Sequence, residues 1–150
     1  MGRKVILGIG NLLLKDEGVG VHAVRLLEEK GVPEGVEVVD GGTLGFDLLG
    51  IFEGTDKVVV IDALRGGGEP GTIYKVRPED LKEDKRQPLS LHQIGFLEVM
   101  EMARLLGFET EVVIIGVEPK EIDWGLELSS EVKGKLQKVI SLALKEIGGA

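Results

Sequence analysis

The sequence contains no cysteine. This absence excludes disulfide bonds, thiolate nucleophiles and sulfur-ligated metal sites, so any metal must be bound by carboxylates, histidine and water. The sequence also lacks an apolar run of the roughly 20 residues needed to span a bilayer. Its short apolar N-terminal segment turns directly into glycines, unlike the core of a signal peptide. We therefore expect a cytoplasmic protein that does not insert into membranes.

Positive charge is also scarce. The chain has 18 Lys and Arg against 26 Asp and Glu, which gives a net charge of −8. Because no local cluster of basic residues offsets this charge, the phosphates of a nucleic acid would be repelled, and we expect no nucleic-acid partner. An acidic surface without such a patch favours a monomer. The 150 residues, 43% of them hydrophobic, suit a single globular domain over 1–150.

Apolar segments alternate with segments of helical periodicity, which indicates an α/β sheet with mainly parallel strands. The predicted strands are 4–9, 36–40, 57–62, 72–76 and 111–117. No helix separates 57–62 from 72–76, so the fourth strand is expected to be antiparallel and at an edge. Right-handed crossovers then favour a three-layer α/β/α sandwich. Its five-stranded, mostly parallel sheet has the order 2-1-3-5-4, with strand 4 antiparallel.

Helices are predicted over four ranges: 17–30, 43–52, 90–107 and 129–147. Thr43 is a suitable N-cap for the second of them. Ser90 and Gln93 form an S-x-x-Q capping box for the third, and Ser129 or Ser130 begins the last. The charged segment 77–88 is predicted to be a surface excursion.

The candidate site lies where the strand order reverses, between the first and third strands. Ligands of such sheets bind beyond the carboxyl ends of the strands at that point. Glu17 follows the first strand, Asp62 ends the third, and His92 lies in the first turn of a helix, whose dipole favours a neutral imidazole. Taken singly, each residue could simply be a helix cap or a hydrogen-bond partner. Together they are two oxygen ligands and one nitrogen ligand, which suit a divalent metal with water in the remaining positions.

Other polar residues have less specific patterns. His22 is expected to be a solvated surface residue, and Asp16 to face solvent or to act as an N-terminal helix charge. Asp40 ends the second strand and is followed by Gly41 and Gly42. Such glycines let the backbone approach a ligand or simply form a tight turn. Glu118, after the fifth strand, points to the same edge of the sheet.

Six segments agree in order and spacing with one protein family. They are GIGNLLLKDEGVG (8–20), DGGTLG (40–45), VIDA (60–63), HQ (92–93), GVEP (116–119) and GLELSSEV (125–132). On these segments the chain resembles the nickel–iron hydrogenase maturation proteases over essentially its full length. Segment 77–88 is less typical of the family and would bear on which hydrogenase is served.

The resemblance implies an endopeptidase, often classed as aspartic-type. It would remove the C-terminal extension of a nickel–iron hydrogenase large-subunit precursor after nickel insertion. It also implies that Glu17, Asp62 and His92 are the metal-binding and catalytic residues. The resemblance implies that the metal would be nickel supplied by the precursor, and that other divalent metals could occupy the site. Asp40, together with Gly41 and Gly42, is implied in substrate recognition.

Two other classes of function share parts of this pattern. A metal-dependent docking protein or nickel chaperone for hydrogenase assembly would show every one of these features. A Rossmann-type dinucleotide binder is disfavoured, because Leu13 occupies the third glycine position after Gly8 and Gly10. In addition, Asp16 and Glu17 would repel a pyrophosphate.

The pattern leaves the activation of the water open. A carboxylate such as Asp62, or one on the substrate, could act as general base. A metal could instead lower the pKa of a bound water. A serine nucleophile is disfavoured because no G-x-S-x-G turn is present and Ser90 is explained as a helix cap.

Overall fold

The computed structural model describes residues 2–43, 45–83 and 89–148. The strands of these residues form one five-stranded sheet in the order β2-β1-β3-β5-β4. Neighbouring strands are parallel except for β4 and β5, which are antiparallel. The predicted strand order and the antiparallel edge strand are therefore confirmed. The strands are β1 Arg3–Ile9, β2 Val36–Gly42, β3 Thr55–Ala63, β4 Ile73–Val76 and β5 Glu111–Val117.

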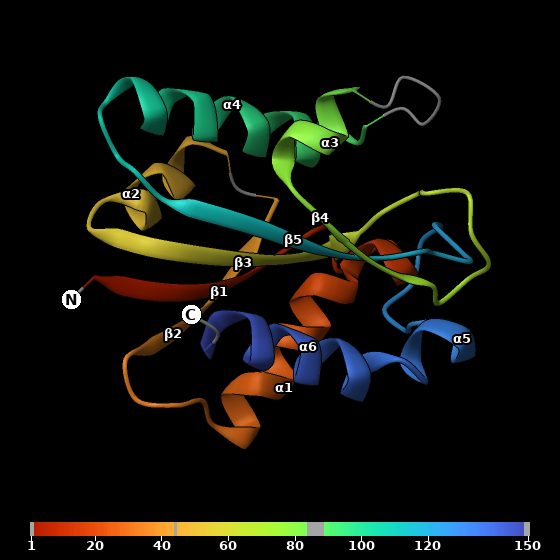
Figure 1. Cartoon of the computed structure of the whole chain (residues 1–150). Coiled ribbons are helices and arrows are strands. Elements are labelled where there is room, and N and C mark those ends of the chain that lie inside the picture. The colour runs from red at the N-terminus through yellow and green to blue at the C-terminus, as the bar shows by residue number, and fades with distance from the viewer. Residues whose placement is uncertain (1, 44, 84–88, 149–150) are drawn as a thin grey trace.

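Helices cover both faces of the sheet and complete the predicted sandwich (Figure 1). One face carries α1 (Val19–Lys30) and α6 (Leu136–Gly148), and the other carries α2 (Leu49–Phe52) and α4 (Leu91–Leu105). The helix α3 (Pro78–Glu83) lies on the α4 side. Within the described ranges, no helix has both the length and the apolar character required to cross a membrane.

Alternating side chains of the central strands form two separate cores. Ile6, Val59 and Ile115 point toward α1 and α6, whereas Leu7 and Val60 point toward α2 and α4. These side chains are at most 2% exposed. Burial on both faces explains why β1, β3 and β5 are continuous apolar runs rather than alternating ones.

The helix boundaries differ from the sequence prediction in four places. The first helix begins at Val19, after the 3-10 turn η1 (Lys15–Gly18). The second begins only with the 3-10 turn η2 (Phe46–Leu48), so the prediction of a helix capped by Thr43 was wrong. The chain instead continues in β2 as far as Gly42, whose backbone carbonyl accepts a hydrogen bond from the Gly10 amide at 2.8 Å.

The predicted final helix is in fact two helices, α5 (Ser130–Lys133) and α6. The break falls at Gly134, a weak residue for a helix interior, and the next amide, of Lys135, bonds back to Val132 at 3.0 Å. The charged excursion contains α3, which was not predicted, and its residues 84–88 lie outside the described part of the chain.

Two glycines allow unusually close backbone contacts near the first turn. A β-carbon on Gly20 would lie 2.1 Å from the carbonyl oxygen of Ile61, so α1 packs directly on the backbone of β3. Gly10 has φ +130°, and a β-carbon there would lie 2.0 Å from the carbonyl oxygen of Glu17. Only glycine permits this return of the chain. The glycine turn therefore brings the backbone of Glu17 to the carboxyl edge of the sheet.

Candidate active site

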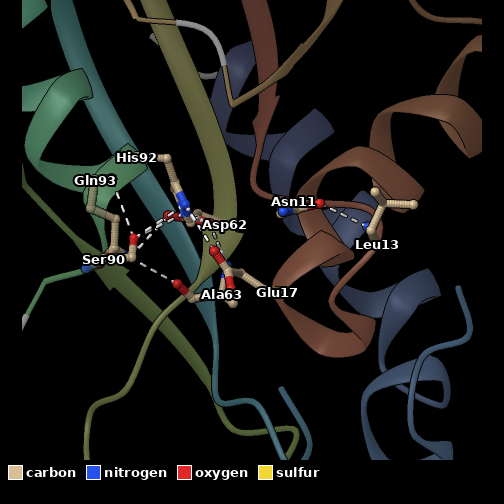
Figure 2. A network of polar contacts seen from close by, with 8 residues as sticks. All are labelled: Asn11, Leu13, Glu17, Asp62, Ala63, Ser90, His92 and Gln93. Carbon is tan, nitrogen blue, oxygen red and sulfur yellow. Dashed lines mark hydrogen bonds and ion pairs between the residues drawn. The ribbon is translucent and has the colours of Figure 1, made fainter. Parts of the chain in front are cut away.

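Glu17, Asp62 and His92 meet at the carboxyl edge of the sheet, as the sequence predicts (Figure 2). Nδ1 of His92 lies 3.0 Å from Oε1 of Glu17, and Nε2 lies 3.1 Å from Oδ1 of Asp62. The imidazole therefore stands between the two carboxylates. The side chains of His92, Glu17 and Asp62 are 6%, 15% and 2% exposed, so solvent screens these contacts only weakly.

Asp62, at the end of β3, is held by two further donors. Its own neighbour, the Ala63 amide, donates to Oδ1 at 2.8 Å, and Nε2 of Gln93 donates to Oδ2 at 2.9 Å. Burial raises the pKa of Asp62, while the hydrogen bonds from His92, Gln93 and the Ala63 amide act against this rise. The carboxylate is thus fixed in a single orientation.

His92 takes its place from the start of α4. The predicted capping box is confirmed, because the Gln93 amide donates to Oγ of Ser90 at 3.3 Å and the Ser90 amide donates to Oε1 of Gln93 at 3.0 Å. Burial lowers the pKa of His92, but the hydrogen bond and charge of Asp62, followed by those of Glu17, outweigh burial and raise it. This direction is opposite to the one expected from the helix dipole alone, because the two carboxylates favour the charged form of the imidazole.

Gln93 has a second task that sequence reasoning missed. Its side-chain amide donates to Asp62 and also to the carbonyl of Ala63 at 2.9 Å, while its oxygen caps the helix. The one sequence signal for this task was its position beside His92. Gln93 therefore locks the first turn of α4 to the end of β3.

Asp16, next to Glu17, is completely buried, so the expectation that it faces solvent was wrong, whereas its place in the first turn of η1 agrees with the alternative of an N-terminal helix charge. Its carboxylate accepts four hydrogen bonds of 2.7–3.0 Å from donors 104 to 113 positions further along the chain. These donors are the amides of Lys120, Glu121 and Ser129 and the hydroxyl of Ser129. Asp16 thus ties the turn that carries Glu17 to the segment after β5.

Two hollows flank the contact between Glu17 and His92, and both are lined by these two residues and Ser90. The first, of about 250 Å³, is completed by Ala63, Arg65, Leu89, Gln93, Pro119 and Ile122. The second, of about 550 Å³, is completed by Asn11, Leu14, Thr43, Gly45, Leu91 and Gly95. Asp62 lines neither hollow, so Glu17 and His92 face the open space while Asp62 lies behind them.

The three side chains match a divalent metal in the chemistry of their donor atoms. In the structure, however, both ring nitrogens of His92 are engaged by carboxylate oxygens. Over residues 2–43, 45–83 and 89–148, no three His, Asp or Glu side chains are spaced as a preformed metal site. A metal would therefore replace the contacts that His92 makes with Glu17 and Asp62. Metal binding by these residues stays a prediction.

Asp40, Gly41 and Gly42 make no hydrogen bond or ion pair with Glu17, Asp62 or His92. Oδ1 of Asp40 accepts a hydrogen bond from the Gly42 amide at 3.1 Å, and Oδ2 lies 3.4 Å from Nε of Arg25. None of these three residues lines either hollow beside Glu17 and His92. Their role in substrate recognition stays a prediction, and their local geometry is that of a strand end with a short turn.

His22 is half-buried, so the expectation of a solvated surface residue was wrong. It lines a hollow of about 190 Å³ together with Leu126 and Leu136, among other residues, and burial lowers its pKa. The sequence pattern of α1 could not show this, because the covering residues lie about 100 positions further along the chain. His22 makes no contact with the triad.

Comparisons with known proteins agree on one family. A family model described as hydrogenase maturation protease matches residues 21–146. The hydrogenase expression/formation protein HupD of Bradyrhizobium diazoefficiens is 40% identical over 145 residues, which cover 94% of this chain and 76% of that protein. The hydrogenase 2 maturation protease of Escherichia coli is 33% identical over 152 residues, with coverages of 97% and 93%.

Solved structures give the same result. The hydrogenase maturating endopeptidase HybD of Escherichia coli superposes with a TM-score of 0.87 at 32% identity, covering 97% of this chain and 94% of that one. The nickel–iron hydrogenase maturation protease HybD of Thermococcus kodakarensis superposes with a TM-score of 0.82 at 36% identity, with coverages of 97% and 99%.

Proposed function

The chain belongs to the hydrogenase maturation protease family, and from that premise we propose that it removes a C-terminal extension from the large-subunit precursor of a nickel–iron hydrogenase. Members of the family are peptidases, so the reaction is hydrolysis of a peptide bond. The observation that carries the proposal is the contact of His92 with Glu17 and Asp62 between two open hollows.

The two hollows favour cleavage within a chain rather than at its end. Glu17 and His92 lie at their junction, so a polypeptide could extend away from the reacting bond in both directions. This arrangement suits an endopeptidase: the extension to be removed would lie in one hollow and the retained part of the substrate in the other.

We further propose that the nickel already inserted in the precursor is the recognition element. It enters as part of the substrate, and Glu17, His92 and Asp62 supply two oxygen ligands and one nitrogen ligand toward it. Fixing the substrate through such a cation would hold the scissile bond in one orientation, which by itself lowers a reaction barrier by several kcal/mol. Cleavage would then follow nickel insertion, because a precursor without nickel lacks this anchor.

Glu17 is the better placed of the two carboxylates to activate water. Its side chain is 15% exposed and lines both hollows, whereas that of Asp62 is 2% exposed and lines neither. A general base must reach the attacking water within hydrogen-bonding distance. We therefore assign proton abstraction to the carboxylate oxygen of Glu17 that does not bind the cation, and to Asp62 the orientation of His92 before the cation replaces their contact.

The test compares precursor with and without nickel, incubated with the protein and followed by mass spectrometry. Loss of one defined C-terminal peptide, only from the nickel-loaded precursor, is expected for the wild type. Glu17→Gln and His92→Ala should abolish this loss. Glu98→Gln is the matched control, because Glu98 is an exposed glutamate on α4.

Other outcomes would contradict the proposal in distinct ways. Equal cleavage of both precursors would contradict recognition through nickel. Tight binding of the loaded precursor without any change in its mass would favour the non-enzymatic docking function instead.

A further inference from the structure

Arg65 lines the first hollow, and the proposed reaction gives this charged residue no role. It lies in the connection between β3 and β4, three positions after Asp62, and is exposed. Among the described residues that line this hollow of about 250 Å³, it is the only lysine or arginine. Arg65 thus lines the same hollow as Glu17 and His92.

The charges around this hollow are unevenly paired. Glu17 and His92 contact each other at 3.0 Å. Arg65 makes no hydrogen bond or ion pair with any residue that the structure describes. Among the other arginines that the structure describes, Arg3, Arg25 and Arg104 pair with carboxylates, whereas the side chain of Arg77 does not. An unpaired guanidinium beside the triad is therefore available to a ligand.

The backbone on both sides of Arg65 is firmly held. The Leu64 amide donates to the carbonyl of Val117 at 3.0 Å, and the Gly66 amide donates to Oε1 of Glu118 at 2.8 Å. Glu118 is only 7% exposed, and the same oxygen accepts the hydroxyl of Tyr74 at 2.7 Å. The backbone that carries Arg65 is thus held in place on both sides.

We propose that Arg65 is a specificity-determining residue that binds a carboxylate of the polypeptide substrate beside the scissile bond, an inference that rests on the proposed function. A guanidinium offers parallel N–H donors that match the two oxygens of a carboxylate. The carboxylate comes either from an acidic side chain flanking the cleavage point or from the C-terminus of the extension. Both sources present the same chemistry to Arg65.

Steady-state cleavage of nickel-loaded precursor tests this role. Arg65→Ala should raise KM about tenfold while leaving kcat within about twofold, because it removes a charged hydrogen bond made equally by bound substrate and transition state. Arg65→Lys should fall between the alanine variant and the wild type. Added salt should raise KM for the wild type but not for Arg65→Ala. Arg104→Ala is the matched control, because Arg104 is exposed in the last turn of α4 and pairs locally with Glu101.

Two altered precursors distinguish the sources of the carboxylate. In one, the acidic residues flanking the cleavage point become amides; in the other, neutral residues added at the end displace the terminal carboxylate. The precursor whose KM with wild-type protein rises to that of Arg65→Ala identifies the source, and a rise with neither overturns the inference. An unchanged KM in Arg65→Ala, or a decrease in kcat without a rise in KM, would also overturn the inference. Failure of the wild type to cleave any precursor would instead overturn the proposed function.

Discussion

Replacing Asp16 by asparagine should strongly destabilise the protein, although the two side chains have nearly the same shape. The carboxylate is completely buried and accepts four hydrogen bonds from the segment after β5. An asparagine has only one acceptor oxygen, and its amide nitrogen must face at least one donor. The least damaging orientation turns that nitrogen toward the amide of Ser129, which donates to Oδ1 at 2.7 Å in the wild type.

The expected cost follows from these four bonds. A hydrogen bond to a charged group contributes about 1.5–3 kcal/mol, and one between neutral groups about 0.5–1.5 kcal/mol. Asp16→Asn loses one bond of the first kind and weakens the other three by roughly 1 kcal/mol each. We therefore expect the free energy of unfolding to fall by about 5 kcal/mol, a large part of the 5–15 kcal/mol typical of a domain.

Urea unfolding followed by circular dichroism measures this change. Asp123→Asn is the matched control, because Asp123 is exposed in the same segment and accepts only from the neighbouring Trp124 amide at 2.8 Å. Its effect should stay within about 0.5 kcal/mol. The amides of Lys120, Glu121 and Ser129 should also exchange hydrogen faster in Asp16→Asn. Equal midpoints for the Asp16 and Asp123 variants would refute the assignment of Asp16 as a buried anchor.

Three further predictions concern stability. Ion pairs with Lys75 and then Lys57 lower the pKa of Glu146 below its usual 4.5. Their contribution to folding stability is therefore present above pH 4.5 and is lost as the pH falls through the folded-state pKa. Across this range, the urea midpoint of the wild type should fall more steeply than that of Glu146→Gln. Gly20→Ala should lower the melting temperature well below that of the wild type in a thermal scan, because its β-carbon would overlap the β3 backbone at 2.1 Å, and a melting temperature at or above wild type would contradict that packing. Phe96→Ala should cost about 3–5 kcal/mol in urea unfolding, since this side chain is 2% exposed in the core beneath α4, and a cost below about 1 kcal/mol would show that the core there is loosely packed.

The sheet could be predicted from the sequence because its signals are local. The apolar runs of β1 and β3, and the absence of a helix between β3 and β4, determine a topology once crossovers are right-handed. The meeting of Glu17, Asp62 and His92 follows from that topology, since each residue stands at or beside the carboxyl edge of a central strand. The capping box of Ser90 was equally visible, because its two partners are three positions apart.

The errors arose where the deciding partners are distant in sequence. Asp16 has the pattern of a solvent-facing helix charge, and only the donors beyond position 119 make it a buried anchor. His22 lies off the apolar stripe of α1, yet the residues around Leu126 and Leu136 cover it. Helical periodicity describes one element at a time and cannot report which other segment will pack against it.

The candidate site is assembled from three stretches of chain: the turn η1, the end of β3 and the first turn of α4. A chain emerging from the ribosome therefore cannot assemble this candidate site until His92 has left the exit tunnel and α4 has docked on β3. Even then β5, which inserts between β3 and β4, is still to be made. Under the proposed function, chains that stop before α4 would lack His92 and could not cleave a precursor, so activity would require a nearly complete fold.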